Sequence, residues 1–350
     1  IWGEDSTLDA LPERPWMFKT QIYRGHGRQL SRILWQVGRL CRSVTKANCD
    51  VLFIPGSVFL GNFSPFVSVS QNLLPFQLDL VREGGRLSQL LKNIGRFFAQ
   101  RKTFVQSDGV IFLTDFAKEI VCRSSNIKCR TSVIPHGISQ SFFHPPKQQC
   151  SIDCYSQRRP YVVLYVSTIN FYKHQCNVIE AVRSLRDRFG WNLELKLIGG
   201  GDEYALKKLE IAMVSADPDR NWIQYEGNIP HDELPEIYRG ADLGLFALSC
   251  ENLPIILLEK MAAGLPIASS YVGPMAEVLG DSATYFDPFV VESIEDAVYR
   301  MLESPDLRER LAWASYEKAT GTTWERCASD TFNFLARIVS RCRYQQRFIV

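Results

Sequence analysis

The second half of the chain alternates short apolar runs with longer stretches of helical periodicity. Residues 161–166 (Tyr-Val-Val-Leu-Tyr-Val) form an apolar, β-rich run bounded by polar residues, as a buried parallel strand would. Apolar positions then recur at helical spacing over 175–189. The same alternation predicts further strands at 193–198, 222–225, 242–247 and 266–269, and further helices at 203–215, 231–239, 253–263 and 274–279. Strands separated by helices predict βαβ units and a parallel, doubly wound α/β sheet.

The first half is similar but less regular. Its four predicted strands lie at 50–55, 66–70, 109–113 and 131–135. A doubly wound domain normally opens with a strand and a glycine-containing turn, yet no convincing buried strand precedes Val51. We therefore expect the N-terminal domain to lack its first βα unit, and truncation is the simplest explanation for a chain that begins with Ile.

The length and the positions of polar stretches predict two domains. A chain of 350 residues exceeds one ordinary domain, and residues 146–160 lie in a polar, proline-containing segment without periodicity, typical of a linker. We expect an N-terminal domain over 1–145 and a C-terminal domain over 161–322. A last helix is expected at 323–345, where Trp324, Phe332, Phe334, Leu335 and Ile338 fall at helical spacing.

Charge is distributed unevenly between these halves. Residues 1–150 carry 19 Lys and Arg against 10 Asp and Glu, whereas residues 151–350 carry 21 against 28. A basic half favours anionic partners such as phospholipid surfaces or phosphorylated substrates. The basic residues form no recognisable nucleic-acid-binding module, so nucleic acid is not expected as a partner.

Cysteine usage and hydropathy bear on the compartment. The ten cysteines show no C-x2-C repeat, which favours free thiols in a reducing cytosol over a metal site at Cys150 and Cys154. No apolar run approaches the ~20 residues of a membrane helix, and the acidic N-terminus is no secretory signal. We expect a cytoplasmic protein.

The basic stretch 82–102 is interleaved with apolar residues at 87–98. One interpretation is an amphipathic helix over 85–104 that lies on an anionic membrane at the cytoplasmic face. The alternative is a helix, or a pair of helices, that packs the same apolar side chains into its own domain.

The most informative segment is Ser249-Cys-Glu-Asn-Leu-Pro-Ile-Ile-Leu-Leu-Glu-Lys-Met-Ala-Ala-Gly-Leu-Pro266. Glu251 follows a predicted strand, and ligands of parallel sheets bind at the carboxyl ends of the strands. The backbone N–H groups of 252–256 begin a helix and can hold a phosphate or sugar oxygen. Glu259 lies among apolar residues, where burial is costly unless its carboxylate is hydrogen-bonded, for example to ribose hydroxyls. A solvent-facing glutamate is the alternative.

This E-x7-E pattern, with Ala262-Ala-Gly-Leu-Pro266 after it, resembles the signature of retaining glycosyltransferase family 4, the glycosyl transferases group 1 with the GT-B fold. Further segments resemble the family in the same order: 132–137, 165–173, 197–202, 226–230 and 238–242. The resemblance covers about 110–340. It implies two Rossmann-like domains that face a cleft, with the final helix returning to the N-terminal domain.

The resemblance also implies roles for residues on the donor side. Lys173 would neutralise the donor diphosphate, Glu259 would bind ribose, and Glu251 would lie beside the donor sugar. The loop residues Asn252, Leu253 and Pro254 would help to hold sugar and phosphate. Gly199 and Gly200 would let the backbone approach the nucleotide, and Gly137 would pass close to the phosphates. Because fixed cations and helix N-termini can stabilise a leaving diphosphate, no metal or other cofactor is expected.

The sequence departs from the family at three places. The usual glycine and arginine before Lys173 are replaced within 167–169, and Asn252 stands where glycine is common. The segment 70–76 resembles a loop that often carries a histidine near the reacting centre, but here Gln71 occupies that position. Glutamine cannot act as a general base, so Gln71 and the neighbouring Asn72 could only hydrogen-bond to a sugar. The alternative is that 70–76 is a plain loop between a strand and a helix. His136 has either a structural or an acceptor-side role.

These observations predict a glycosyltransferase that moves a sugar from a nucleotide-sugar donor to a saccharide or lipid-linked acceptor with retention. We expect a place in the synthesis of cell-envelope or surface polysaccharide or glycolipid. A non-catalytic nucleotide-sugar-binding protein or an inactive fragment is the alternative, and an epimerase of the same fold is a second. The formal D-x-D at Asp217 and Asp219 is interpreted as an ordinary turn rather than a metal site.

Overall fold

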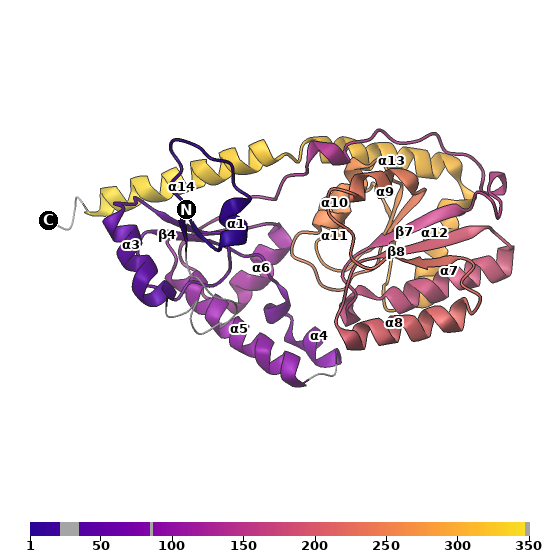
Figure 1. The fold of residues 1–350 in the computed structure, drawn as a ribbon, viewed down its shortest axis with the longest axis horizontal. Coiled ribbons are helices and arrows are strands. Elements are labelled where there is room, and N and C mark those ends of the chain that lie inside the picture. The colour runs from indigo at the N-terminus through magenta and orange to yellow at the C-terminus, as the bar shows by residue number, and fades with distance from the viewer. Residues whose placement is uncertain (22–34, 85–86, 347–350) are drawn as a thin grey trace.

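The protein is described by a computed structural model that covers residues 1–21, 35–84 and 87–346. Two parallel sheets organise these residues, one in each half of the molecule (Figure 1). The N-terminal sheet contains β3 (Leu52–Ile54), β4 (Phe66–Val69), β5 (Gly109–Phe112) and β6 (Arg130–Val133), hydrogen-bonded in chain order. β3 is therefore an edge strand of this sheet. Among the described strands, the order across the sheet follows the order along the chain.

The C-terminal sheet has six parallel strands. Their order across the sheet is β12 (Thr284–Phe286), β11 (Ile267–Ser270), β10 (Leu243–Phe246), β7 (Tyr161–Val166), β8 (Leu193–Ile198) and β9 (Ile223–Tyr225). The chain enters at β7, builds outward through β8 and β9, then returns to the other side of β7 with β10. The strand order thus reverses between β7 and β10, and such a switch point opens a crevice at the carboxyl ends of the two strands.

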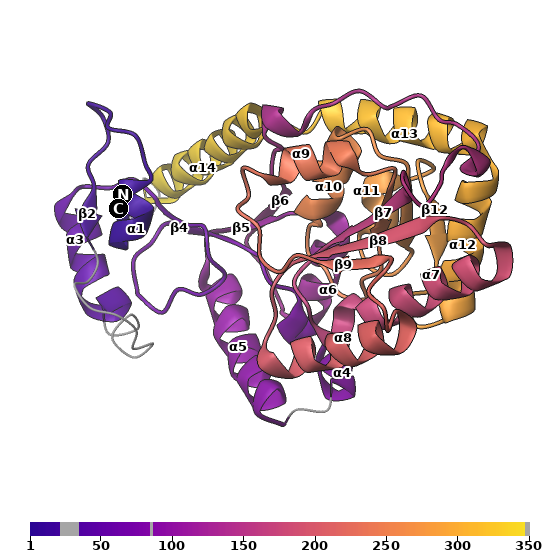
Figure 2. The same cartoon turned by 45° about the vertical axis from the view of Figure 1, so that its right-hand side comes forward.

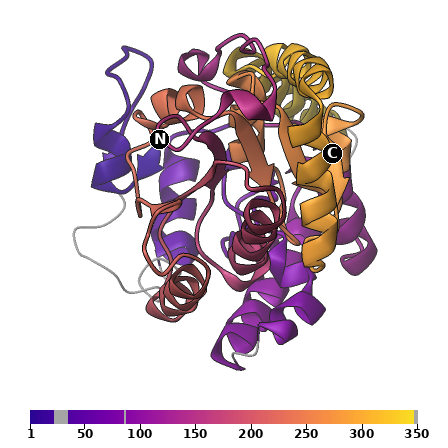
Figure 3. The same ribbon diagram turned by 90° about the vertical axis from the view of Figure 1, so that its right-hand side faces the viewer.

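Helices cover both faces of the C-terminal sheet (Figures 1 and 3). One face carries α7 (Gln175–Phe189) and α8 (Glu203–Ala216), and α12 (Val291–Glu303) contacts α7. The other carries α9 (Leu234–Gly240), α10 (Ile255–Ala262) and α13 (Pro305–Thr320), while α11 (Met275–Leu279) follows β11. Because both faces are covered, β7 is a continuous apolar run, β10 is fully buried, and four of the six residues of β8 are buried.

The N-terminal sheet is covered by α5 (Leu87–Gln106), α6 (Asp115–Ser124) and α14 (Trp324–Gln346), and α4 (Leu78–Glu83) packs against α5. α14 crosses from the C-terminal half and runs along the N-terminal half (Figures 1 and 2). Its Phe334 and Ile338 are buried against the sheet, since a Cβ placed at Gly109 would lie 2.9 Å from the Phe334 ring. This placement fits the resemblance. The domain boundaries expected from the sequence stay a prediction.

The remaining elements are short. β1 (Trp2–Gly3) and β2 (Thr20–Gln21) form a separate two-stranded sheet, and α1 (Asp5–Asp9) lies between them. A π-helical turn (Trp35–Leu40) leads into α3 (Cys41–Lys46). Single 3-10 turns occur at Leu74–Phe76, Gln140–Phe142, Ile152–Cys154 and Phe171–Lys173.

Most elements expected from periodicity are present. β7, α7 and β8 have the expected limits, and the strands and helices from 203 to 279 agree within a few residues. The prediction missed α6 and placed no element between residues 279 and 323, where the structure has β12, α12 and α13. The expected helix 85–104 is α5, although residues 85 and 86 lie outside the described residues.

α5 presents three of its apolar side chains outward, whereas its Phe104 is fully buried. Asn93, Gln100 and Thr103 are buried, whereas the most exposed apolar side chains of the helix are those of Leu87, Leu91 and Phe98, which are 61–70% exposed. The expectation that the helix packs its apolar residues into its own domain is therefore wrong for these three residues. Buried Asn93 donates to the Gln89 carbonyl and Thr103 to the Phe59 carbonyl, which supports the polar inner face.

Candidate active site

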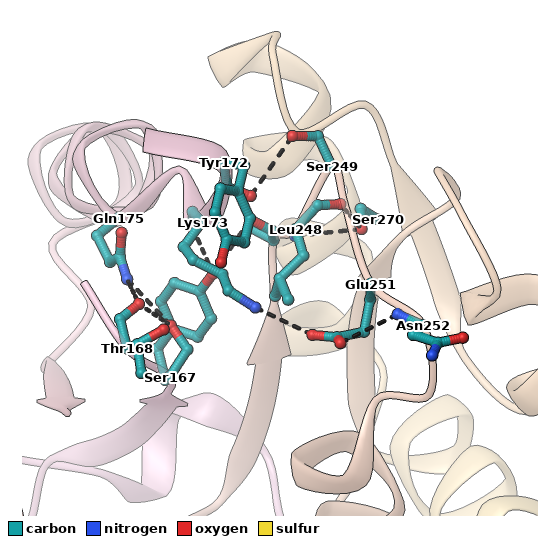
Figure 4. A network of polar contacts seen from close by, with 12 residues as sticks. Ser167, Thr168, Tyr172, Lys173, Gln175, Leu248, Ser249, Glu251, Asn252 and Ser270 are labelled. Carbon is teal, nitrogen blue, oxygen red and sulfur yellow. Dashed lines mark hydrogen bonds and ion pairs between the residues drawn. The ribbon is translucent and has the colours of Figure 1, made fainter. Parts of the chain in front are cut away.

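The candidate site lies at the switch point between β7 and β10. Lys173 ends the 3-10 turn that follows β7, and Glu251 lies in the loop between β10 and α10. The Lys173 Nζ lies 3.0 Å from the Glu251 Oε2, so the structure brings together the two residues expected to act on the donor (Figure 4). The lysine side chain is 7% exposed and the glutamate side chain 26%, so the pair faces a mostly dry environment.

The position of Lys173 is fixed by its neighbours. The Tyr165 hydroxyl lies within hydrogen-bonding distance of the Lys173 and Ala247 carbonyls, and so ties the lysine turn to the end of β10. The Lys173 Nζ also lies 5.0 Å from the centroid of the Tyr172 ring, a cation–π contact. The Ser249 N–H donates to the Tyr172 carbonyl at 3.0 Å. Backbone and side chains together therefore hold the cation at the edge of the sheet.

His174 follows the lysine in a left-handed conformation with φ 48°. Its Nε2 lies 2.9 Å from the Ser249 Oγ, and burial lowers the pKa of the imidazole to about 4. The ring is therefore neutral near pH 7 and adds no charge beside Lys173.

The loop before Lys173 lacks the usual glycine and arginine of the family, and Gln175 stabilises it. The Gln175 Nε2 donates to the Ser167 Oγ and to the Thr168 carbonyl, each at 3.0 Å (Figure 4). The first turn of α7 therefore holds this loop by neutral hydrogen bonds.

The glycines after β8 permit a close backbone approach. A Cβ at Gly199 would lie 1.9 Å from the Ser167 carbonyl oxygen, and the residue has φ +133°, which side chains rarely adopt. A Cβ at Gly200 would lie 2.5 Å from the Asn228 side chain. The requirement for glycine here comes from packing of the loops after β7, β8 and β9, in addition to any approach of a nucleotide.

Glu259 is deeply buried, not solvent-facing. It is 3% exposed, its Oε2 accepts a hydrogen bond from the Tyr238 hydroxyl at 2.9 Å, and its Oε1 lies 2.9 Å from the His231 Nε2. As expected, hydrogen bonds compensate for the burial of this carboxylate. In the structure they come from protein side chains and not from a ribose. His231 is 68% exposed at its side chain, so it is the partner that a ligand can displace.

Asn252 joins the two halves of the molecule. Its Nδ2 donates to the Ser70 carbonyl at 2.6 Å, and its own carbonyl accepts from the Thr114 Oγ1 at 2.9 Å. The loop between β10 and α10 thereby contacts the segments after β4 and β5. Glu277 of α11 adds a second tie, because its carboxylate accepts from the Asp115 and Phe116 N–H groups at the start of α6.

Part of the backbone expected to bind phosphate is already occupied. The Asn252 N–H donates to the Glu251 Oε1 at 3.1 Å, and the Ile255 N–H donates to the Leu253 carbonyl at 2.9 Å. Leu253 and Pro254 are buried beneath this loop. A phosphate at the start of α10 would therefore have to replace the Glu251 carboxylate at the Asn252 amide.

The acceptor-side residues lie across from this loop. The Gln71 side chain is exposed, and its N–H donates to the Ser57 Oγ. The Asn72 Oδ1 accepts from the Leu74 N–H at 3.1 Å, so this side chain forms a local turn. His136 contacts the Trp324 ring at 5.4 Å between centroids, and burial lowers the pKa of its imidazole.

Gly137 has a structural role that the sequence did not show. A Cβ at this position would lie 2.0 Å from the Trp324 N, and the Ile138 N–H donates to the Thr322 carbonyl. Glycine is therefore required where the chain crosses back toward α14. The expected approach of Gly137 to phosphates stays a prediction.

Two cavities lie beside the candidate site. One of about 230 Å³ is lined by Asn170, His174 and Gln175 near Lys173, by Asp202 at the start of α8, and by Gly84 from the N-terminal half. The other, about 380 Å³, contains Gln71 and His136 and is otherwise largely apolar, with Trp324, Phe332 and Leu335 of α14 among its walls. A polar space and an apolar space thus lie beside opposite parts of the site.

The alternative metal sites have structural explanations. The Asp217 carboxylate accepts from the N–H groups of Asn221, Trp222 and Ile223, which confirms the expected turn. All ten cysteines are free thiols. Within residues 1–21, 35–84 and 87–346, no three His, Cys, Asp or Glu side chains cluster closely enough to hold a metal ion. In the same residues, no helix is long and apolar enough to cross a bilayer.

Sequence reasoning missed several groups at the site. His231 and Tyr238 hold Glu259, Ser70 and Thr114 hold Asn252, and Lys260 is fully buried beside Glu259. The signal for Tyr238 was present, because it lies in a segment that resembles the family. The other contacts join positions far apart in the chain, which no local pattern indicates.

Two facing parallel sheets, a switch-point crevice with a lysine and a glutamate, and a final helix that returns to the first half define the GT-B glycosyltransferase fold. Residues 156–318, a little under half of the chain, match the family model described as glycosyl transferases group 1. The C-terminal half therefore contains a glycosyl transferases group 1 domain.

Known proteins agree with this assignment. The chain is 24% identical over 236 residues to the O-antigen chain mannosyltransferase B of Escherichia coli, covering 64% of this chain and 59% of that protein. It is 26% identical over 245 residues to a GDP-mannose-dependent alpha-(1-6)-phosphatidylinositol monomannoside mannosyltransferase of Mycobacterium tuberculosis, covering 65% and 62%. The matched part is thus less than two thirds of either relative.

The fold has a solved counterpart. Sucrose-phosphate synthase from Thermosynechococcus elongatus superposes with a TM-score of 0.75 at 17% identity, over 95% of this chain and 86% of that one. At this identity the similarity establishes the fold alone.

Proposed function

We propose that this chain is a retaining glycosyltransferase of family 4 type, which transfers a sugar from a nucleotide-sugar donor to a saccharide or lipid-linked acceptor. The observation that carries the proposal is the Lys173–Glu251 pair at the switch point between β7 and β10. A ligand with a diphosphate and a sugar matches this pair, since the lysine attracts the phosphates and the carboxylate accepts sugar hydroxyls.

The donor side follows from the same geometry. The diphosphate would draw Lys173 away from Glu251 and would use the positive end of α10, which Asn252, Leu253 and Pro254 directly precede. The ribose would replace His231 at Glu259, and the nucleotide would lie along Gly199 and Gly200, with Gly137 across the cleft. Lys173 and the helix N-terminus would stabilise the leaving diphosphate. The proposed reaction uses no metal or other cofactor.

The acceptor would enter from the N-terminal half and would meet Gln71, Asn72 and His136. Both relatives described above are named as mannosyltransferases, one of an O-antigen chain and one of a phosphatidylinositol mannoside. We therefore propose a place in the synthesis of cell-envelope or surface polysaccharide or glycolipid, at the cytoplasmic face of a membrane.

The outward side of α5 supports membrane contact. Leu87, Leu91 and Phe98 are exposed on a helix that also carries Lys92, Arg96, Arg101 and Lys102. Exposed apolar side chains among basic ones fit an anionic lipid surface, where each basic residue contributes on the order of 1 kcal/mol.

A thermal-shift screen of nucleoside diphosphates and their sugars would test the donor assignment. A ligand at about 100 times its dissociation constant should stabilise the fold by about 2.7 kcal/mol. Release of nucleoside diphosphate from the best donor, with saccharide and lipid-linked acceptors supplied, would then test catalysis. We expect turnover by the wild type and its loss in Glu251→Gln, with retained anomeric configuration in the product.

The same experiments separate the alternatives. A non-catalytic nucleotide-sugar-binding protein would show the thermal shift without turnover on any acceptor or water. An epimerase would convert the nucleotide sugar with no acceptor present, which product analysis would reveal.

A further inference from the structure

Lys260 is a fully buried lysine at the candidate site. It follows Glu259 on α10 and has 0% exposure, and its Nζ has no hydrogen-bond partner among the residues that the structure describes. The side chain runs over β10, where a Cβ at Gly244 would lie 2.9 Å from the Lys260 Cδ. The absence of a side chain at Gly244 of β10 therefore provides the space that the Lys260 side chain fills.

Aromatic rings surround the amine. The Nζ lies 5.0 Å from the ring centroid of Phe246 on β10, 5.9 Å from that of Tyr165 on β7, and 6.0 Å from that of Tyr238 on α9. These ring faces attract a cation but accept no hydrogen bond comparable to that of a carboxylate. An ammonium group in such a place loses its hydration without a full replacement, so the neutral amine is favoured.

Two charged groups act on this amine. Glu259, from the same helix, favours the protonated form, and Lys173, from the turn after β7, opposes it. Burial is the largest influence and lowers the pKa of Lys260 to about 7. Burial also raises the pKa of the Tyr165 and Tyr238 phenols well above their usual range, so both rings stay neutral. Burial and Lys173 favour the neutral amine and Glu259 opposes them, so the two forms are close to balance near neutral pH.

A bound donor would change this balance. In the ligand-free protein, the charge of Lys173 is paired with Glu251 at 3.0 Å. A nucleoside diphosphate at Lys173 brings at least two negative charges to the same edge of the sheet, and negative charge near a buried amine favours its protonated form.

We infer that Lys260 takes up a proton from solvent when a nucleoside diphosphate binds at Lys173, so that donor binding is coupled to the charge of this buried side chain. This inference rests on the proposed function for the site of the diphosphate. Lys260 touches no substrate in this scheme. It is a positioning residue that acts electrostatically on the diphosphate. Its neutral form avoids a buried positive charge when no diphosphate is bound, and its charged form attracts the bound diphosphate.

The coupling makes donor affinity depend on pH. Because the diphosphate favours the protonated amine, affinity in the wild type should fall as pH rises above about 7, by roughly threefold to tenfold per pH unit until the pKa of the complex is reached. Lys260→Met keeps the length and apolar stem of the side chain but cannot take up a proton. Its affinity should change less over the same range.

Isothermal titration calorimetry tests this directly, with UDP and GDP as probes. Titrations in buffers of different ionisation enthalpy give the number of protons taken up on binding. The wild type at about pH 8 should take up more protons than Lys260→Met, with a difference on the order of 0.5 to 1, which should vanish near pH 5.5 where Lys260 is already charged. Lys207→Met, at an exposed lysine of α8, is the matched control and should behave as the wild type.

His231→Gln controls for proton uptake by the imidazole that contacts Glu259. In the His231→Gln background, the protein with Lys260 should still take up more protons on binding than the protein with Lys260→Met. Equal proton uptake by the wild type and Lys260→Met, with both binding the probe, would overturn the inference and leave the proposed function intact. If neither UDP nor GDP binds the wild type, the proposed donor site itself is wrong, and the inference falls with it.

Discussion

Replacing Lys260 by methionine should stabilise the protein near neutral pH. The folded protein lowers the pKa of Lys260 from 10.5 to about 7, so between these values the unfolded chain binds more protons than the folded one. Stability of the wild type should therefore rise with pH across this window, and be lowest at and below about pH 7. The fall of this pKa from 10.5 to about 7 corresponds to roughly 4 kcal/mol of lost stability at pH 7.

Lys260→Met removes this penalty and keeps the packing over Gly244 and Phe246. Urea denaturation at about pH 7 should therefore give a free energy of unfolding higher than that of the wild type by up to about 4 kcal/mol. The difference should shrink to below about 1 kcal/mol near pH 10.5, where the unfolded lysine is also losing its charge. Lys207→Met, with a side chain that is 72% exposed, should stay within about 0.5 kcal/mol of the wild type at both pH values. A Lys260→Met difference that does not change with pH would refute a buried, discharged amine.

Three further predictions concern the loops and the outer helix. Gly199→Ala should lower the free energy of unfolding by about 3 kcal/mol or more in urea denaturation, because its Cβ would meet the Ser167 carbonyl at 1.9 Å, whereas Gly240→Ala, with open space, should change it little. Asn252→Ala should cost about 1–3 kcal/mol in the same assay, since it leaves the buried Ser70 carbonyl without its donor; an unchanged value would mean that the interdomain bond is absent in solution. Replacing Leu91 and Phe98 together by serine should reduce binding to anionic vesicles by about tenfold or more and leave unfolding nearly unchanged, and undiminished vesicle binding would argue against α5 as the contact.

The central strands and their helices could be predicted from the sequence because their burial is local and complete. Both faces of the C-terminal sheet are covered, so β7 is an apolar run that a window of six residues reveals, and β8 has buried leucines at every second position. The prediction placed no element between residues 279 and 323, although Ile294, Val298 and Met301 fall at helical spacing in α12. The short strand β12 offers only three residues before that helix, which is too little to mark another βα unit.

The resemblance located Lys173 and Glu251, whose pairing in the structure is the core of the candidate site. It could not show that His231 covers Glu259 or that Asn252 ties the loop to Ser70, since these contacts join distant segments. Lys260 illustrates the limit most clearly. A lysine on a helix is usually exposed, and only the missing side chain of Gly244 and three surrounding rings let it be buried.

The central claim is that the Lys173–Glu251 pair is the binding site of a nucleoside diphosphate and its sugar. Calorimetric binding of UDP and GDP to the wild type, Lys173→Met and the control Lys207→Met tests it most directly. The account predicts that Lys173→Met weakens the preferred nucleotide by about 10- to 100-fold, the value of a charge-assisted hydrogen bond of about 1.5–3 kcal/mol, while Lys207→Met binds as the wild type does. Equal affinity in the wild type and Lys173→Met would contradict the account.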